Sequence, residues 1–208
     1  KPDQAEFEKQ MKRVAEPEKN MADKNAAHPT QDLRSVDAES RQIRAPIDGV
    51  IFSAPPVHED HRGVLVEMYR ESQFWEEPFA YAYQTSLRPG VAKGWFLHRE
   101  KSDRYHLAVG EVMLFLYDDR EGSPTRGLAS KSVLSEKNHR DVFIPAGIWH
   151  LSLNVGSGDA VLINLPTTRY NPESPDRFHL PFDTDQIPID VRSHFPIAQM
   201  GPIHPQAR

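Results

Sequence analysis

From Ile47 onward, short apolar runs rich in Val, Ile, Phe and Tyr recur along the chain and are divided by Gly, Pro, Asp and Asn. About ten of these runs have the length of a strand, and none of them carries a long 3.6-residue period. The runs are GVIFSAP, GVLVEMYR, FAYAYQTSL, GWFLH, RYHLAV, EVMLFLY, SKSVLS, DVFIPAG, HLSLNVG and AVLINLP. Closely spaced short strands of this kind predict an all-β sandwich or barrel, such as a jelly roll.

The two ends of the chain have a different texture. Residues 1–45 are charged and poor in large apolar side chains, which predicts an exposed polar arm. Within it, Ala5 to Ala15 form a candidate short helix that ends near Pro17. The last part of the chain is rich in Pro and Asp and is expected to be irregular chain wrapped on the domain. The predicted organisation is therefore a polar, partly helical arm followed by one β domain over residues 46–208.

Composition narrows the classes of function. A length of 208 residues favours a single domain. The net charge of -5 gives no general attraction to nucleic acid or to an anionic membrane. The absence of cysteine excludes disulfides, thiolate metal sites and a cysteine nucleophile. No apolar run approaches the roughly 18 residues of a membrane helix, and no signal peptide is visible. We expect a cytoplasmic protein that binds a small molecule.

The stretch KGWFLHREKSDRYHLAVGEV, residues 93–112, indicates a strand, a turn and a second strand. His98 stands at the end of the first strand, a position typical of a catalytic or metal-binding histidine. Alternate residues of a small barrel's strands face inward, so Phe96 and His98 are expected to share one face. The same alternation places His150 and Ser152 on one face of a later strand.

Two longer blocks carry a resemblance to a known family. They are GVIFSAPPVHEDHRGVLVEMYR, residues 49–70, and YDDREGSPTRGLASKSVLSEKNHRDVFIPAGIWH, residues 117–150. In this order they resemble the dTDP-4-dehydrorhamnose 3,5-epimerase family, whose members are double-stranded β-helix (cupin) proteins. YQTSLRPGVAKGWFLH and TTRYNPES fall where that family has its Q-x-N/S, R-G-L-H and Y-Y-x-P-E segments. The resemblance covers about residues 46–190. It implies a cupin jelly roll, usually a homodimer, whose cavity accepts a nucleotide-linked sugar.

The resemblance also implies a reaction, in which a histidine base held by a carboxylate removes a proton next to a ketone and a tyrosine acts as the acid. Residue by residue, the family's basic histidine falls on Phe96, its arginine on Lys93 and its tyrosine on Asn164. The late S-x-K-D motif that supplies the orienting carboxylate has no counterpart after Asp190. Phenylalanine cannot move a proton. The sequence therefore predicts a reworked site in a kept pocket.

We predict that His98 and His150 are the catalytic residues, with His98 as the general base. Substrate-binding residues are expected where the family holds the nucleotide and sugar, and at the altered site positions: Arg62, Glu67, Gln84, Lys93, Phe96 and Asn164. Basic side chains near a pyrophosphate would form charge-assisted hydrogen bonds with it. The structural alternatives are an ion pair between Arg62 and Glu67 and a cross-strand hydrogen bond of Gln84.

The same stretch fits the general cupin pattern, and this fit supports a metal alternative. The spacing of His98 and Asp103 matches the first cupin motif, and P-x-G-x2-H-x3-N, which contains His150, matches the second. These three residues form a two-histidine, one-carboxylate set, which suits Fe or another divalent metal. Because the resembled family uses no metal, we expect no cofactor. A further alternative is that Asp103 forms an ion pair with Arg99 or Arg104.

Three hypotheses for the function follow. The first is a divergent nucleotide-sugar epimerase or isomerase, which transfers protons on a dTDP-keto-sugar or a related substrate of carbohydrate biosynthesis or secondary metabolism. The second is a metal-dependent cupin enzyme that uses the two-histidine, one-carboxylate set. The third is a ligand-binding cupin that has kept the pocket and lost the chemistry. A homodimer is expected for all three, and no nucleic acid or membrane partner.

Overall fold

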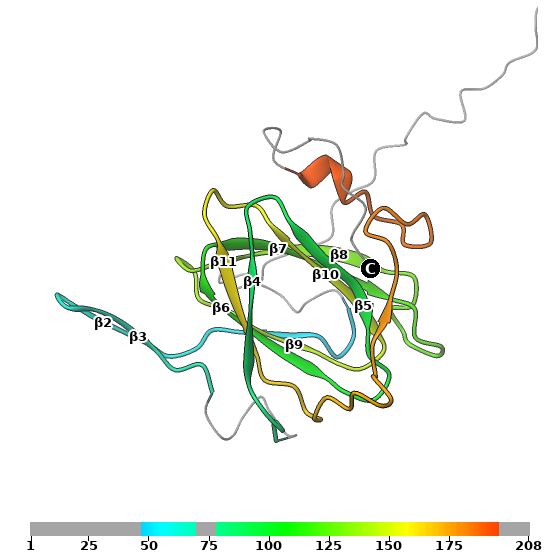
Figure 1. Cartoon of the computed structure of the whole chain (residues 1–208), viewed down its shortest axis with the longest axis horizontal. Coiled ribbons are helices and arrows are strands. Elements are labelled where there is room, and N and C mark those ends of the chain that lie inside the picture. The colour runs from blue at the N-terminus through cyan, green and yellow to red at the C-terminus, as the bar shows by residue number, and fades with distance from the viewer. Residues whose placement is uncertain (1–46, 70–77, 196–208) are drawn as a thin grey trace, which may run out of the picture. The chain divides into compact units, whose positions relative to one another are not determined.

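The computed structural model describes residues 47–69 and 78–195, in which two five-stranded antiparallel sheets enclose a hydrophobic core (Figure 1). The first sheet has the order β1 (Ile51–Ser53), β9 (Asp141–Ile144), β6 (Asp103–Val109), β11 (Ala160–Asn164), β4 (Tyr83–Leu87). The second has the order β12 (Phe178–His179), β5 (Ala92–Leu97), β10 (Ile148–Asn154), β7 (Glu111–Asp118), β8 (Ala129–Ser135). The prediction of an all-β jelly roll is confirmed. The predicted polar arm lies outside the described residues.

Strand β7 shows how the sequence produces this packing. Its residues alternate between two faces, and Val112, Leu114 and Leu116 point into the core between the sheets. Phe115 lies on the other face, in a second apolar cluster. That cluster consists of Trp95, Phe115, Leu151, Leu153, Ile187 and Val191. Because both faces of β7 are buried, it reads as an uninterrupted apolar run. The last two members of the cluster come from the Pro-rich C-terminal segment, which wraps on the domain as predicted.

The block YDDREGSPTRG forms the turn that follows β7. The carboxylate of Asp118, which is fully buried, accepts hydrogen bonds from Arg120 at 3.0 Å, Ser123 at 2.6 Å and Thr125 at 2.7 Å. Burial alone would raise the pKa of Asp118, but these hydrogen bonds outweigh it and hold the pKa well below its ordinary value. Arg120 and Thr125 also bond the backbone of Asp48. The role of this block is therefore structural, because its hydrogen bonds connect the end of β7 to the start of the β domain.

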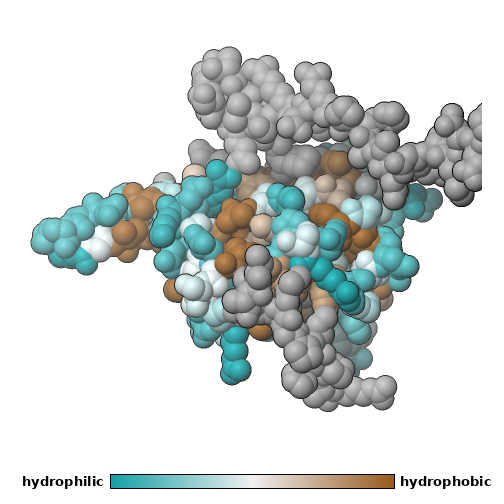
Figure 2. All heavy atoms as spheres, turned by 90° about the horizontal axis from the view of Figure 1, so that it is seen from above, coloured by the Kyte–Doolittle hydropathy of each residue, from teal (hydrophilic) through white to brown (hydrophobic). Residues whose placement is uncertain are grey.

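A hairpin of β2 (Val57–Asp60) and β3 (Gly63–Val66) forms a separate two-stranded sheet that projects from the barrel (Figure 1). Its apolar side chains are exposed: Val64 is 52% and Leu65 is 58% accessible. Figure 2 shows hydrophobic residues on the projecting hairpin next to its hydrophilic tip. In the described part of the chain the single helical element is the 3₁₀ turn Arg192–His194, and no helix there is long and apolar enough to cross a membrane.

Candidate functional site

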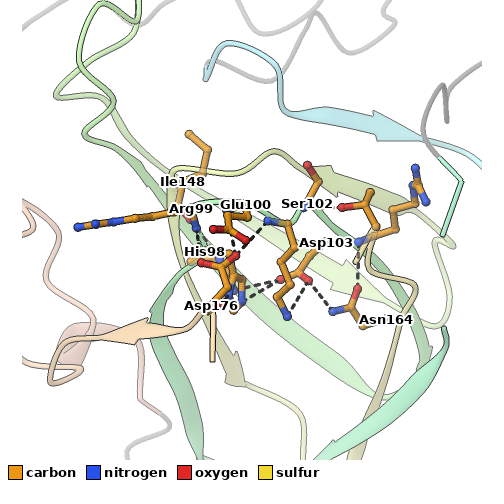
Figure 3. Close-up of polar contacts among 12 residues, drawn as sticks. His98, Arg99, Glu100, Ser102, Asp103, Ile148, Asn164 and Asp176 are labelled. Carbon is orange, nitrogen blue, oxygen red and sulfur yellow. Dashed lines mark hydrogen bonds and ion pairs between the residues drawn. The ribbon is translucent and has the colours of Figure 1, made fainter. Parts of the chain in front are cut away.

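The structure brings His98, Asp103 and His150 together where β5, β6 and β10 meet. His98 directly follows the last residue of β5, Asp103 is the first residue of β6, and His150 lies in β10 opposite Phe96. Nε2 of His98 and Nε2 of His150 each lie 3.5 Å from the same oxygen, Oδ2 of Asp103. All three residues are buried, with 6%, 2% and 2% of their surfaces accessible. Figure 3 shows His98 and Asp103 facing each other. The proximity inferred from the cupin spacing is thus what the structure shows.

Backbone carbonyls fix which nitrogen of each ring carries the proton. Nδ1 of His98 contacts the carbonyl oxygen of Asp176, and Nδ1 of His150 lies 3.1 Å from that of Ile148. A carbonyl only accepts hydrogen bonds, so each Nδ1 must be the donor, and in the neutral ring Nε2 then carries a lone pair. Burial lowers the pKa of His98 to about 4, with Asp103 opposing this shift and His150 adding to it. Burial also lowers the pKa of His150. Both rings are therefore neutral near pH 7, and their lone pairs face the carboxylate.

The other oxygen of Asp103 is held by the protein. Oδ1 accepts a hydrogen bond from Nδ2 of Asn164 at 2.8 Å and lies 3.7 Å from Nζ of Lys101. Asn164 also donates to the hydroxyl of Tyr83 at 2.9 Å and accepts the backbone N–H of Arg104 at 3.0 Å. Both amide hydrogens of Asn164 are thus engaged, so this residue orients Asp103. Direct donation from Asn164 to a substrate would require one of these bonds to break. The ammonium group beside Asp103 belongs to Lys101, where an ion pair with Arg99 or Arg104 was the expected alternative.

Two tyrosines place phenol groups next to this cluster. Tyr83, on β4, is bonded to Asn164, and Tyr105, on β6, has its ring centroid 5.9 Å from that of His150. Burial, with Asp103 adding to it, raises the pKa of Tyr83 to about 12 and that of Tyr105 well above its ordinary value. Both phenols therefore stay protonated at neutral pH and can donate. Tyr105 went unpredicted, although alternation along β6 places it on the same face as Asp103.

The segment around Asp176 closes one side of the site. The carboxylate of Asp176 accepts the backbone N–H groups of Arg99, Glu100 and Lys101 at 2.8, 2.9 and 3.0 Å (Figure 3). Burial would raise the pKa of Asp176, but these three bonds lower it. Asp176 thereby fixes the turn after His98 and, through its carbonyl, the His98 ring. No local signal in the Pro-rich sequence marks this aspartate, which lies far along the chain from the turn that it binds.

Phe96 and Lys93 lie on β5 close to the site. The ring of Phe96 has its centroid 6.3 Å from that of His150, and the guanidinium of Arg177 lies 5.0 Å from the Phe96 centroid. Nζ of Lys93 donates to the hydroxyl of Thr85 at 2.7 Å. Phe96 thus supplies an apolar wall beside His150, with a cation above it. The substrate-binding roles of Phe96 and Lys93 stay predictions.

The other predicted binding residues lie away from the cluster. Arg62 is exposed at the tip of the β2–β3 hairpin and pairs with Asp60 at 2.5 Å, where an ion pair with Glu67 was the expected alternative. Glu67 contacts Nε2 of His58 at 3.3 Å. Gln84, on β4, is exposed, and alternation along the strand points it away from the face that carries Tyr83. Within the described residues, the structure does not bring Arg62, Glu67 and Gln84 into contact with the cluster.

Comparison with known proteins agrees with this architecture. Residues 44–199 match the family described as dTDP-4-dehydrorhamnose 3,5-epimerase. A probable low-salt glycan biosynthesis epimerase of Haloferax volcanii is 37% identical over 64% of this chain and 87% of its own length. The spore coat polysaccharide biosynthesis protein SpsL of Bacillus subtilis is 31% identical over 72% of this chain and 99% of its own.

Solved structures of sugar epimerases and isomerases share the fold of this chain. A dTDP sugar isomerase from Desulfovibrio desulfuricans superposes with a TM-score of 0.67 at 25% identity, over 71% of this chain and 94% of that one. An epimerase from Legionella pneumophila, solved in complex with dTDP-4-keto-L-rhamnose, superposes with a TM-score of 0.64 at 26% identity, over 71% of this chain and 81% of that one.

Proposed function

Because this chain belongs to the dTDP-4-dehydrorhamnose 3,5-epimerase family, we propose that it is an isomerase that moves a proton next to the carbonyl of a nucleotide-linked keto sugar. A proton on such a carbon is acidic, because the charge left behind spreads onto the carbonyl oxygen. A positioned base and a positioned acid are then sufficient for the reaction. The named activities of the relatives and the ligand of the Legionella pneumophila structure support this class of substrate.

The observation that carries the proposal is the position of Nε2 of His98 beside Asp103, with Nδ1 of the same ring on the carbonyl of Asp176. In the proposed reaction Nε2 takes the proton from carbon, and the imidazolium that results is stabilised by Asp103, whose Oδ2 lies 3.5 Å away. The phenols of Tyr83 and Tyr105, which stay protonated, are the groups that return a proton. His98 stands two residues after Phe96, the position of the family's base. The base therefore approaches the sugar from a different point than in the parent reaction.

The test is turnover of a dTDP-linked 4-keto-6-deoxy sugar by the His98→Asn variant. Loss of a general base lowers the rate by about 100- to 10,000-fold. His106→Asn is the matched control, because His106 is equally buried and bonded to Asp141 at 2.8 Å, but lies on the other face of β6. Near-normal turnover by His98→Asn would remove His98 as the base. Binding of the nucleotide sugar without turnover in the wild-type protein would favour the ligand-binding hypothesis.

We also propose that the protein is a homodimer in which the β2–β3 hairpin packs on the second copy. The support is the exposed Val64 and Leu65 on a hairpin that pairs only with itself in the described chain. Exposed apolar patches of this kind mark interaction surfaces. Sedimentation of the wild-type protein should show a dimer, and Leu65→Asp should shift it toward the monomer. A wild-type monomer at micromolar concentration would contradict the proposal.

A further inference from the structure

Three hydrogen-bond acceptors converge at the centre of the site. His98, Asp103 and His150 each offer one ligand atom, and these three atoms lie within 4.8 Å of one another; Nε2 of each histidine is 3.5 Å from Oδ2 of Asp103. Nε2 of His150 is fully buried and has no hydrogen-bond partner. With both Nδ1 atoms donating to backbone carbonyls, no donor hydrogen of these three side chains points into the space between them. Converging lone pairs around a carboxylate repel one another unless a positive charge lies among them. We propose that His98, Asp103 and His150 bind a divalent transition-metal ion.

The spacing of the acceptor atoms fits a metal ion. Metal–nitrogen and metal–oxygen distances of about 2.1 Å at tetrahedral angles put neighbouring ligand atoms about 3.4 Å apart. Both nitrogen-to-oxygen separations in the cluster are 3.5 Å. Two imidazoles and one carboxylate leave at least one coordination position open, which suits Zn²⁺, Fe²⁺ or Co²⁺ better than the oxygen-seeking Mg²⁺ or Ca²⁺.

The groups behind the three ligands are also those of a metal site. Metal-binding histidines commonly donate their second ring N–H to a backbone carbonyl, which fixes the tautomer that coordinates. Asp176 and Ile148 supply these carbonyls here. The hydrogen bond from Asn164 engages Oδ1 of Asp103 and leaves Oδ2 turned toward the two histidines. The orientation of all three ligand atoms is therefore set by the protein before any ion binds.

This inference goes beyond the proposed function and does not depend on it, because metal binding can be measured without substrate. The metal site and the proposed reaction both use Nε2 of His98. An ion bound to Nε2 of His98 occupies the lone pair that would take the proton from the sugar. The metal-loaded protein should therefore lose the turnover that we assign to His98, and chelation should restore it.

The test uses the full chain, purified without a histidine tag and treated with chelator, titrated with Co²⁺ alone. We expect one ion per chain, with visible absorption bands of a low-symmetry Co²⁺ site and displacement by Zn²⁺. His150→Ala and Asp103→Asn should each weaken binding by about 100-fold or more. His106→Asn should bind as the wild-type protein does, because its ring lies outside the cluster. Circular dichroism of each variant separates loss of the site from loss of the fold.

Each outcome discriminates between the proposals. Absence of Co²⁺ binding to the folded wild-type protein, or equal binding by His150→Ala, would overturn the metal site and leave the proposed function standing. Binding that raises the turnover of the keto sugar would confirm the site and overturn the role of His98 as base.

Discussion

Asn164→Leu tests the hydrogen bonds that hold the carboxylate of the site. Leucine keeps the branched shape of asparagine and removes its polar atoms. The charged oxygen of Asp103 then loses its donor at 2.8 Å, which costs about 1.5–3 kcal/mol. The buried backbone N–H of Arg104 loses its acceptor, which costs about 1–3 kcal/mol. Tyr83 is partly exposed and can bond water instead. We expect the free energy of unfolding to fall by about 3–5 kcal/mol, measured by urea denaturation.

Asn154→Leu is the matched control for this variant. Asn154 is equally buried and also makes three hydrogen bonds, all with neutral backbone groups, to Leu87, Gly156 and Gly158. It should be destabilised to a similar extent. Only Asn164→Leu should change the ¹⁵N chemical shifts of His98 and His150, because only this change frees Asp103. A loss below about 1 kcal/mol for Asn164→Leu, or equal shift changes in both variants, would refute this account of the site.

Three other predictions follow from single contacts. Gly94→Ala should lower the free energy of unfolding by about 3 kcal/mol, because the new Cβ would lie 2.6 Å from the backbone of β10 at a φ of +129°. The control Gly158→Ala has open space around the new Cβ and should have little effect, so equal unfolding midpoints for the two variants would contradict the prediction. Asp118→Asn should be less stable than the wild-type protein, and because the pKa of Asp118 is depressed in the folded state, the difference in unfolding free energy should be complete above about pH 4 and shrink as the pH falls. A difference in unfolding free energy that grows in acid would contradict this prediction. Asp176→Ala should release the turn after His98, so that the ¹⁵N shifts of His98 report mixed tautomers; an unchanged spectrum would show that the carboxylate of Asp176 does not fix the ring.

Much of the fold was predictable because a strand's burial pattern is local. The uninterrupted apolar run within EVMLFLYD, which marks β7 as a strand buried on both faces, is visible without any partner strand. The meeting of His98, Asp103 and His150 was also predictable, since a jelly roll brings these strand positions together. The tautomers of the two histidines could not be predicted, because they depend on the backbone carbonyls of Asp176 and Ile148.

Other parts of the site depend on contacts between segments far apart in the sequence. Asp176 binds a turn about residue 100 from within a Pro-rich stretch that has no periodic pattern. Asn164 was placed by alignment with the family's tyrosine, whereas its role follows from hydrogen bonds to Asp103 and Tyr83. The hairpin that carries Arg62 reads as ordinary β structure, and nothing in its sequence shows that it stands away from the barrel. Irregular and projecting segments therefore set the limit of the sequence analysis.

The central claim is that the buried cluster exchanges a proton next to a sugar carbonyl. The most direct measurement is ¹H NMR of a dTDP-linked 4-keto-6-deoxy sugar incubated with the chelator-treated protein in D₂O. We predict that the signal of a hydrogen adjacent to the carbonyl disappears with the wild-type protein, and about 100-fold more slowly with His98→Asn. Retention of every such hydrogen by a folded wild-type protein that binds the nucleotide sugar would contradict the claim.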